Sequence, residues 1–226
     1  MHHLLLKPKN LVLIRHAESE RNRGKKGVFY TEQERSKLGN TLNQDIALTA
    51  KGHKQAKAAG KVLKKKYSEF DIIINSGYLR TRQTMDGIIS QFPKDSLATT
   101  TIMENSALRE RDAGWAYLMT QDEVNNYFPW NTEVWNLGDK FFTRPPGGES
   151  LADTAIRLDV FFTQLAQLCE GKNVLLVAHG RAIVAMQSLL ENWTHAHYKN
   201  IPPDLPNTGM ITYHYSDKKK KLVRDK

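Results

Sequence analysis

Short aliphatic stretches recur along the chain, and most of them are followed by polar or charged groups that open a helix-like segment. Buried parallel strands have this composition, because both of their faces are covered. A last stretch alternates apolar and polar residues, as an edge strand does. We therefore expect buried strands at residues 11–14, 70–74, 97–103 and 174–178, and an edge strand at residues 209–215.

Between these strands, apolar residues recur at spacings of three and four, which predicts helices. Ser150 and Asp153 approximate the capping box that begins a helix. The alternation predicts an α/β fold: a three-layer sandwich with a largely parallel central sheet, helices on both faces and an antiparallel strand at one edge. We expect one domain over residues 1–226, with helices at residues 49–67, 79–91, 150–170, 180–190 and 193–200.

Two segments depart from this alternation and are expected to form a cap. Residues 24–44 are polar and basic, as in an inserted loop, with one helical turn. Residues 117–144 are rich in aromatic residues, and the sequence Phe128-Pro129-Trp130 breaks them into two short helices. These aromatic residues either pack as a small satellite core over the sheet, which we favour, or form a substrate lid.

Composition narrows the function classes. The 226 residues are 40% hydrophobic, which permits a sizeable core, and no apolar run approaches the ~18 residues of a membrane span. The first residues do not resemble a signal peptide. Cys169 is the single cysteine, which excludes an internal disulfide and a cysteine metal cluster. A cytoplasmic protein is the simplest interpretation.

The formal net charge of +9 favours anionic partners: phosphorylated metabolites, nucleic acid or an anionic membrane surface. Lysines at residues 64–66 and in the basic tail, residues 216–226, are expected to be solvated. Lys25, Lys26 and Arg35 lie in the inserted segment and are candidates to cover a ligand pocket. No aromatic-and-basic motif for nucleic acid is present, so we expect neither a nucleic-acid nor a membrane partner.

Three predicted strands end next to basic groups. Arg15 and His16 follow the first strand, Arg80 lies in the helix start after the second, and His179 follows the fourth. The carboxyl ends of parallel strands lie along one edge of a sheet, where open α/β folds bind ligands. Two arginines, two histidines and the N–H groups of helix starts suit a dianion, and phosphate is the natural candidate.

The segment R-H-A-E-S-E-R-N, residues 15–22, resembles the signature of the histidine phosphatase superfamily, also called phosphoglycerate mutase-like. Four further blocks resemble that family's motifs in its order and extend the match along the chain: D-I-A-L-T-A-K-G-H-K-Q-A, S-G-Y-L-R-T-R-Q-T, L-R-E-R-D-A-G and V-A-H-G, at residues 45–56, 76–84, 108–114 and 177–180. The combination of R-E-R-D-x-G with P-G-G-E-S resembles a branch of broad-specificity phosphatase-like members.

The resemblance implies a role for each matching residue. His16 would be the nucleophile that accepts the phosphoryl group, and Glu110 would protonate the leaving group and then activate water. Arg15, Arg80 and a protonated His179 would hold the phosphoryl oxygens. A phosphohistidine splits one difficult step into two easier ones, and phosphoryl transfer needs mainly positioning and charge stabilisation. No cofactor and no metal is implied.

Other residues near these motifs receive less specific expectations. Asn22 and Gly180 match family positions near the phosphate and are expected to bind substrate. Glu149 has two interpretations, a pocket contact and a structural cap. Ala17, Gly77 and Tyr78 depart from the family's usual residues and bear on the width of the pocket. Glu18 and Ser19 are expected to cap or support, Arg82 to lie on the surface, and His53, His195, His197 and His214 to be non-catalytic.

The first functional hypothesis is a phosphomonoester hydrolase that acts through a phosphohistidine on a small phosphorylated metabolite. One alternative is a bisphosphoglycerate-dependent phosphoglycerate mutase, which we disfavour because such enzymes carry a longer segment than the one from Glu110 to His179. The other is a non-catalytic module that binds phosphate or phosphoproteins. Residues 24–44 and 117–144 would set specificity. The sequence does not fix the oligomeric state and is compatible with a homodimer.

Overall fold

The computed structural model describes residues 6–24, 27, 29–137 and 140–225. Lys25 and Lys26 of the basic insertion lie outside the described residues. None of the helices in the described ranges is both long and apolar enough to cross a membrane.

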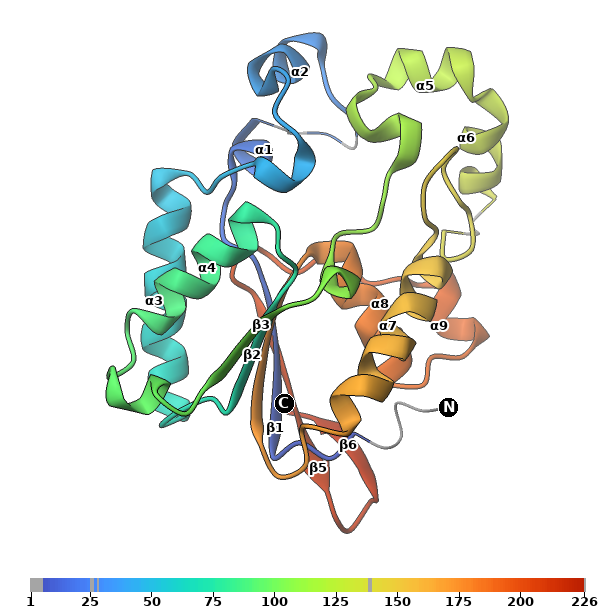
Figure 1. The fold of residues 1–226 in the computed structure, drawn as a ribbon. Coiled ribbons are helices and arrows are strands. Elements are labelled where there is room, and N and C mark those ends of the chain that lie inside the picture. The colour runs from blue at the N-terminus through green and yellow to red at the C-terminus, as the bar shows by residue number, and fades with distance from the viewer. Residues whose placement is uncertain (1–5, 25–26, 28, 138–139, 226) are drawn as a thin grey trace.

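A mixed sheet forms the centre of the fold, with the order β3-β2-β4-β1-β5-β6 over the described residues. The first four strands in sequence pair in parallel, and the last two are antiparallel. The predicted fold class is confirmed, because helices cover both faces of this sheet (Figure 1). The strands are β1 (Asn10–Arg15), β2 (Ile72–Asn75), β3 (Thr101–Glu104), β4 (Asn173–Ala178), β5 (Met210–Ser216) and β6 (Lys221–Arg224).

Successive residues of the central strands point to opposite faces, so each strand contributes to two cores. In β1, Leu11 and Leu13 pack toward α7 (Leu151–Ala166) and α8 (Gly180–Leu190), while Val12 and Ile14 pack toward α3 (Ala50–Lys66) and α4 (Leu79–Ile89). All four side chains are fully buried. This double burial explains why the strand reads as a continuous aliphatic run.

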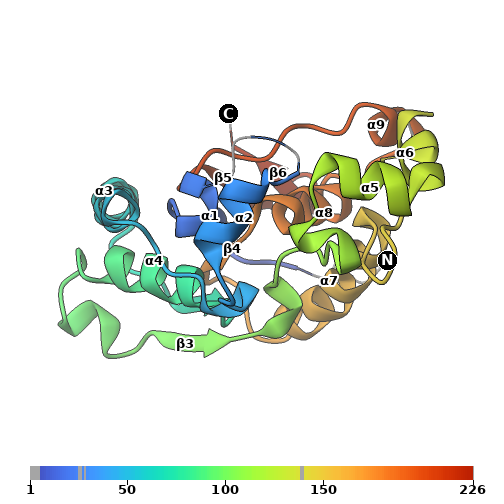
Figure 2. The ribbon, with the colours of Figure 1, turned by 90° about the horizontal axis from the view of Figure 1, so that it is seen from above.

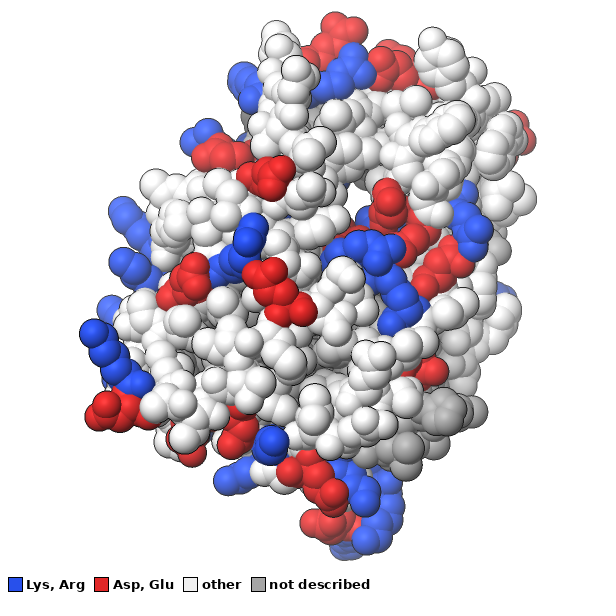
Figure 3. Space-filling model, in the orientation of Figure 1, with Lys and Arg blue, Asp and Glu red and all other residues white. Residues whose placement is uncertain are grey.

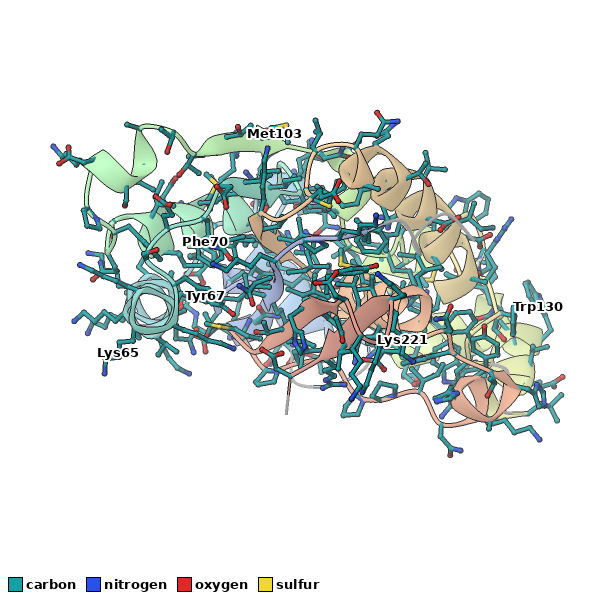
Figure 4. All side chains as sticks on the ribbon, turned by 90° about the horizontal axis from the view of Figure 1, so that it is seen from below. Lys65, Tyr67, Phe70, Met103, Trp130 and Lys221 are labelled. Carbon is teal, nitrogen blue, oxygen red and sulfur yellow. The ribbon has the colours of Figure 1, made fainter. Side chains whose placement is uncertain are left out.

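The helices begin where their sequence signals predict. Thr49 accepts a hydrogen bond from the Gly52 N–H and caps α3, and Ser150 with Asp153 forms a complete capping box for α7. Tyr67 and Phe70 pack together between α3 and β2, with ring centroids 5.1 Å apart (Figure 4). The expected helix at residues 193–200 is shorter, as α9 (His195–Lys199).

Two strand predictions need correction. The third strand begins at Thr101 and not at residue 97, because Asp95–Leu97 forms a 3-10 turn; β3 is then a short, largely exposed edge strand. The lysines of the basic tail at residues 218–221 are exposed as expected, yet Lys221–Arg224 forms a strand that was not predicted, β6, which pairs with β5. The antiparallel edge is therefore a pair of strands. Leu222 and Val223 are half-buried, which gives the tail an apolar reason to pair.

The two segments predicted as a cap stand above the carboxyl edge of the parallel strands (Figures 1 and 2). Arg35 donates to both carboxylate oxygens of Glu123 at 2.8 and 2.7 Å, and the Tyr30 N–H donates to the Met119 carbonyl, so the segments contact each other. A break at Phe128 separates two short helices as predicted. The cap segments contain the helices α2 (Glu32–Leu38), α5 (Gln121–Tyr127) and α6 (Pro129–Asn136), and α1 (Glu20–Gly24) leads into the first of them.

Candidate active site

The residues that follow the parallel strands lie together at the carboxyl edge of the sheet. His16 is 4% exposed, Arg80 2% and His179 0%, and the rings of the two histidines lie 5.1 Å apart, edge to face. Arg15, His16, Arg80 and Glu110 all line one cavity. The topology therefore brings together groups that are up to 164 positions apart, from Arg15 at the end of β1 to His179, the N-cap of α8.

His16 has a defined tautomer. Its Nδ1 lies 2.7 Å from the Ala17 carbonyl oxygen, which can only accept, so Nδ1 carries the proton and Nε2 carries a lone pair. Burial and the charges of Arg80 and Arg15 lower the pKa of His16 well below the ordinary histidine value. The imidazole is therefore neutral at physiological pH, which is the form that can act as a nucleophile.

His179 is held by a chain of hydroxyl groups. Its Nε2 lies 2.8 Å from Ser76 Oγ, Ser76 Oγ lies 2.9 Å from Thr81 Oγ1, and Thr81 Oγ1 donates to the Tyr78 carbonyl at 2.7 Å. Every contact is satisfied when Nε2 donates to Ser76, which leaves the buried Nδ1 without a protein partner. Burial, Arg80 and His16 lower the pKa of His179 well below the ordinary value. The free protein thus differs from the expected protonated His179.

Arg80 and Arg15 supply positive charge that no carboxylate within the described ranges neutralises through an ion pair. Arg80 donates to the Asn43 carbonyl at 2.6 Å and lies over the Tyr78 ring, 4.7 Å from its centroid. Burial lowers the pKa of Arg80 to about 10, so it stays charged. Arg15 donates to the Leu205 carbonyl, while its buried Nε has no protein partner. Tyr78, a departure from the family motif, thus supports an active-site arginine.

The orientation of the Asn22 amide is fixed by three donors. Its Oδ1 accepts from the Ser19 N–H at 3.2 Å, the Ser19 hydroxyl at 3.1 Å and Asn207 Nδ2 at 3.1 Å. The amide nitrogen of Asn22 therefore remains available to donate to a ligand in the cavity that this residue lines. Asn207 also donates to the His16 carbonyl at 3.0 Å, so one side chain positions both residues.

Glu110 enters the cavity from the loop after β3. One carboxylate oxygen accepts from the N–H groups of Arg111 at 2.9 Å and Ala182 at 3.2 Å, and the other faces the Arg181 N–H at 3.4 Å. The first turn of α8 thus fixes this carboxylate opposite the histidines. It is the one glutamate among the described residues that line the cavity.

Glu149 is a structural residue and does not line the cavity. Its carboxylate accepts from Arg109, from both Arg157 nitrogens and from the Asp112 N–H, at 2.6 to 3.0 Å. Burial acts to raise the pKa of Glu149, but these hydrogen bonds and charges outweigh it and lower the pKa. The residue therefore joins the R-E-R-D and P-G-G-E-S motifs and holds the loop that carries Glu110.

The other residues singled out from the sequence, Gly180, Arg82 and the four histidines outside the site, do not line the cavity. Gly180 packs against Asp204 and does not line the cavity. The absence of a side chain at Gly180 allows this contact, because a Cβ on Gly180 would lie 2.3 Å from a carboxylate oxygen of Asp204. Arg82 lies on the surface, 3.8 Å from Glu104. His53, His195 and His197 are exposed, and His214 lies by Asp225.

Sequence reasoning missed several residues of the cavity. Arg21 lies within the first motif, donates to Asn43 Oδ1 at 3.2 Å and stacks on Tyr117. Asp204 forms an ion pair with Arg181 at the cavity wall. Asn207 follows Pro206 in an irregular loop, where no periodic signal marks it. Among the described residues, no group of three or more His, Cys, Asp or Glu side chains is arranged to hold a metal ion.

The family model of the histidine phosphatase superfamily (branch 1) matches residues 11–225. A 2,3-bisphosphoglycerate-dependent phosphoglycerate mutase of Bartonella quintana is 34% identical over 186 residues, which make up 81% of this chain and 82% of that protein. The mutase of Methylocella silvestris is 33% identical over 207 residues, or 89% of this chain and 87% of its own.

Solved structures of low sequence identity have the same fold. A mycobacterial glucosyl-3-phosphoglycerate phosphatase with inorganic phosphate is 22% identical, with a TM-score of 0.71 and 96% of both chains covered. The alpha-ribazole phosphatase of Shigella flexneri is 19% identical, with a TM-score of 0.72, covering 96% of this chain and 94% of its own. These matches and the five motifs give one conclusion: the chain belongs to the histidine phosphatase superfamily.

Proposed function

We propose that this protein hydrolyses phosphomonoesters through a phosphohistidine formed on His16. The observation that carries the proposal is the state of that side chain: a buried, neutral imidazole with Nε2 free, beside two arginines for which the described residues provide no carboxylate partner. A phosphoryl dianion placed among Arg15, Arg80 and the Asn22 amide would present its phosphorus to Nε2. Positioning and charge stabilisation are the main needs of this reaction.

The two chemical steps use the same groups in turn. In the first, Nε2 of His16 forms a bond to phosphorus while the bond from phosphorus to the substrate oxygen breaks, and Glu110 in its acid form gives that oxygen a proton. In the second, Glu110 takes a proton from water, the water oxygen bonds to phosphorus, and the P–N bond breaks. Inorganic phosphate leaves and His16 returns to its neutral form.

A phosphoglycerate mutase is the second candidate, and sequence identity to curated mutases favours it. These relatives are close to this chain in overall length, because the aligned residues cover nearly equal shares of both chains. The two activities share the phosphohistidine and differ in its fate. A mutase returns the phosphoryl group to a second hydroxyl, whereas a hydrolase loses it to water.

Phosphate release from a chromogenic phosphate ester tests the first proposal, with wild type, His16→Ala and His53→Ala compared. His53 is an exposed histidine of α3 that does not line the cavity, and it serves as the matched control. We expect His16→Ala to lose at least about a hundredfold in kcat, as nucleophile removal does, and His53→Ala to match wild type. Equal release by all three would remove His16 from the mechanism.

A second assay separates hydrolase from mutase. The protein is incubated with 3-phosphoglycerate, with and without 2,3-bisphosphoglycerate, and both 2-phosphoglycerate and inorganic phosphate are measured. Phosphate in excess over the isomer supports the hydrolase, and isomerisation that depends on the bisphosphate supports the mutase. Tight phosphate binding without either product would indicate a binding module.

A further inference from the structure

The catalytic cavity, with a volume of about 620 Å³, is much larger than a phosphoryl group needs. Ligand pockets of roughly 300–1,000 Å³ hold molecules of drug size, so a three-carbon ester would leave much of this volume unfilled. The groups that suit phosphate lie at the sheet edge, on one side of the cavity. The rest of the cavity wall is therefore available to contact the alcohol part of the substrate.

Charge is segregated in this cavity. The charged residues that line it come from the end of β1, from α1, α4 and α8 and from loops: Arg15, Arg21, Arg80, Glu110, Arg111, Arg181 and Asp204. Every described lining residue that comes from residues 27–29 and 113–146 is uncharged. The described lining residues of these two cap segments thus offer no cation to a second anionic group.

The uncharged roof combines apolar surface with amide groups. Phe29, Val124, Phe128 and Trp135 supply the apolar part, and the side chains of Gln121, Asn131 and Asn136 supply donors and acceptors. Such a mixture suits a ring system with neutral polar substituents, because the ring buries apolar area while the amides meet its polar atoms.

Phe128 lines the cavity at the junction of the two short helices of the roof. Phe128 is the C-cap of α5 and also the N-cap of α6. Pro129 begins α6 directly after it, so the backbone at the junction is constrained. Its ring lies 6.5 Å from Trp115 and 6.4 Å from Trp130. Trp130 is 54% exposed at the outer side of the cap and does not line the cavity (Figure 4).

We propose that the roof of the cavity, centred on Phe128, is a binding compartment for the alcohol part of the substrate, and that the substrate is the phosphate monoester of an uncharged, ring-containing alcohol. This proposal rests on the proposed phosphatase function. An ester whose second anion lies against the roof is disfavoured, because that charge would lose water beside described lining residues that carry no cation. Arg21, which comes from α1 and not from the roof, donates to Asn43 and lies over the Tyr117 ring. Arg181 is already paired with Asp204, and Arg111 donates to the Glu149 carbonyl.

The test compares 2-phenylethyl phosphate with ethyl phosphate, two alkyl esters of which only one carries a ring. Burial of a ring predicts that kcat/KM of wild type is at least about tenfold higher for the phenylethyl ester. Phe128→Ala should lower kcat/KM for this ester at least about fivefold more than for ethyl phosphate. Trp130→Ala is the matched control and should leave the preference unchanged. Trp135→Ala is a second roof variant, should Phe128→Ala fail to fold.

Binding of 2-phenylethylphosphonate and ethylphosphonate, measured by calorimetry, separates this proposal from the proposed function. These analogues have a carbon–phosphorus bond and are not hydrolysed. Tighter binding of the ring compound without turnover of any ester would overturn the phosphatase proposal and support the compartment. Three results would overturn the compartment. The two phosphonates bind equally, the ring preference survives both roof variants, or kcat/KM is higher for 3-phosphoglycerate than for the phenylethyl ester.

Discussion

Acidification from about pH 7 to about pH 5.5 should destabilise this protein through its two active-site histidines. His16 and His179 are 4% and 0% exposed, and burial, with nearby Arg80, lowers the pKa of each well below 6.5. In the unfolded chain both titrate near 6.5. Below that pH the unfolded state therefore binds protons that the folded state does not, and stability falls as the pH falls.

The size of the effect follows from linkage. A histidine that stays neutral in the folded state and has an unfolded pKa of about 6.5 costs roughly 1.3 kcal/mol between pH 7 and pH 5.5, so the pair costs about 2.5 kcal/mol. Carboxylates do not account for this loss. The lowered pKa values of Glu149 and of Asp153, at about 2, give stability that is lost only as the pH falls below the unfolded carboxyl range, near 4.

Urea unfolding at the two pH values measures this difference directly, in a buffer without phosphate. A His16→Gln/His179→Gln double variant is the control. Whatever its absolute stability, its free energy of unfolding should change less between the two pH values than that of wild type, by most of the 2.5 kcal/mol. Each single variant should lose about half. Two results would refute the neutral state of the two histidines. Either the free energy of unfolding of wild type does not change between the two pH values, or the double variant shows the same change as wild type.

Three further predictions concern the geometry of the site. Binding of phosphate above about pH 7, where it is a dianion, should take up about one proton, because the unpartnered Nδ1 of His179 must become a donor; calorimetry in two buffers of different ionisation enthalpy measures this, and no uptake would contradict it. Asn207→Asp should raise KM more than it lowers kcat, since a carboxylate cannot donate to Asn22 Oδ1 and the His16 carbonyl; unchanged KM in steady-state assays would show that Asn22 is oriented without it. Glu110→Gln should lower kcat/KM, which reports only the step that forms the phosphohistidine, about a hundredfold or more for ethyl phosphate but much less for a nitrophenyl ester, whose leaving group needs no proton; equal losses of kcat/KM for both esters would argue against proton donation.

The core of the site could be predicted from sequence because its residues follow recognisable strands. Arg15 and His16 end a run that is aliphatic on both faces, and His179 ends another, so parallel pairing alone places them at one edge. Asn207 could not be found in this way. It acts from an irregular loop before β5, and its partners Asn22 and His16 are distant in sequence.

Charge was a poor guide at the chain's end. The lysines around residues 218–221 suggested a solvated tail, yet two half-buried aliphatic residues were enough to form β6. The net charge of +9 likewise did not translate into one basic surface on the face shown in Figure 3, where acidic and basic side chains are interspersed. Inside the cavity, Arg15 and Arg80 carry positive charge that no described carboxylate pairs with.

The most direct test of the account is to locate the phosphoryl group during turnover. Wild type and Glu110→Gln are mixed with a nitrophenyl phosphate ester, quenched in alkali, where phosphohistidine survives, and digested for peptide mass spectrometry. The account predicts one phosphoryl group on the peptide that contains His16, formed as fast as the first nitrophenol is released. Rapid turnover with no phosphorylated peptide, or with the group on any residue other than His16, would contradict it.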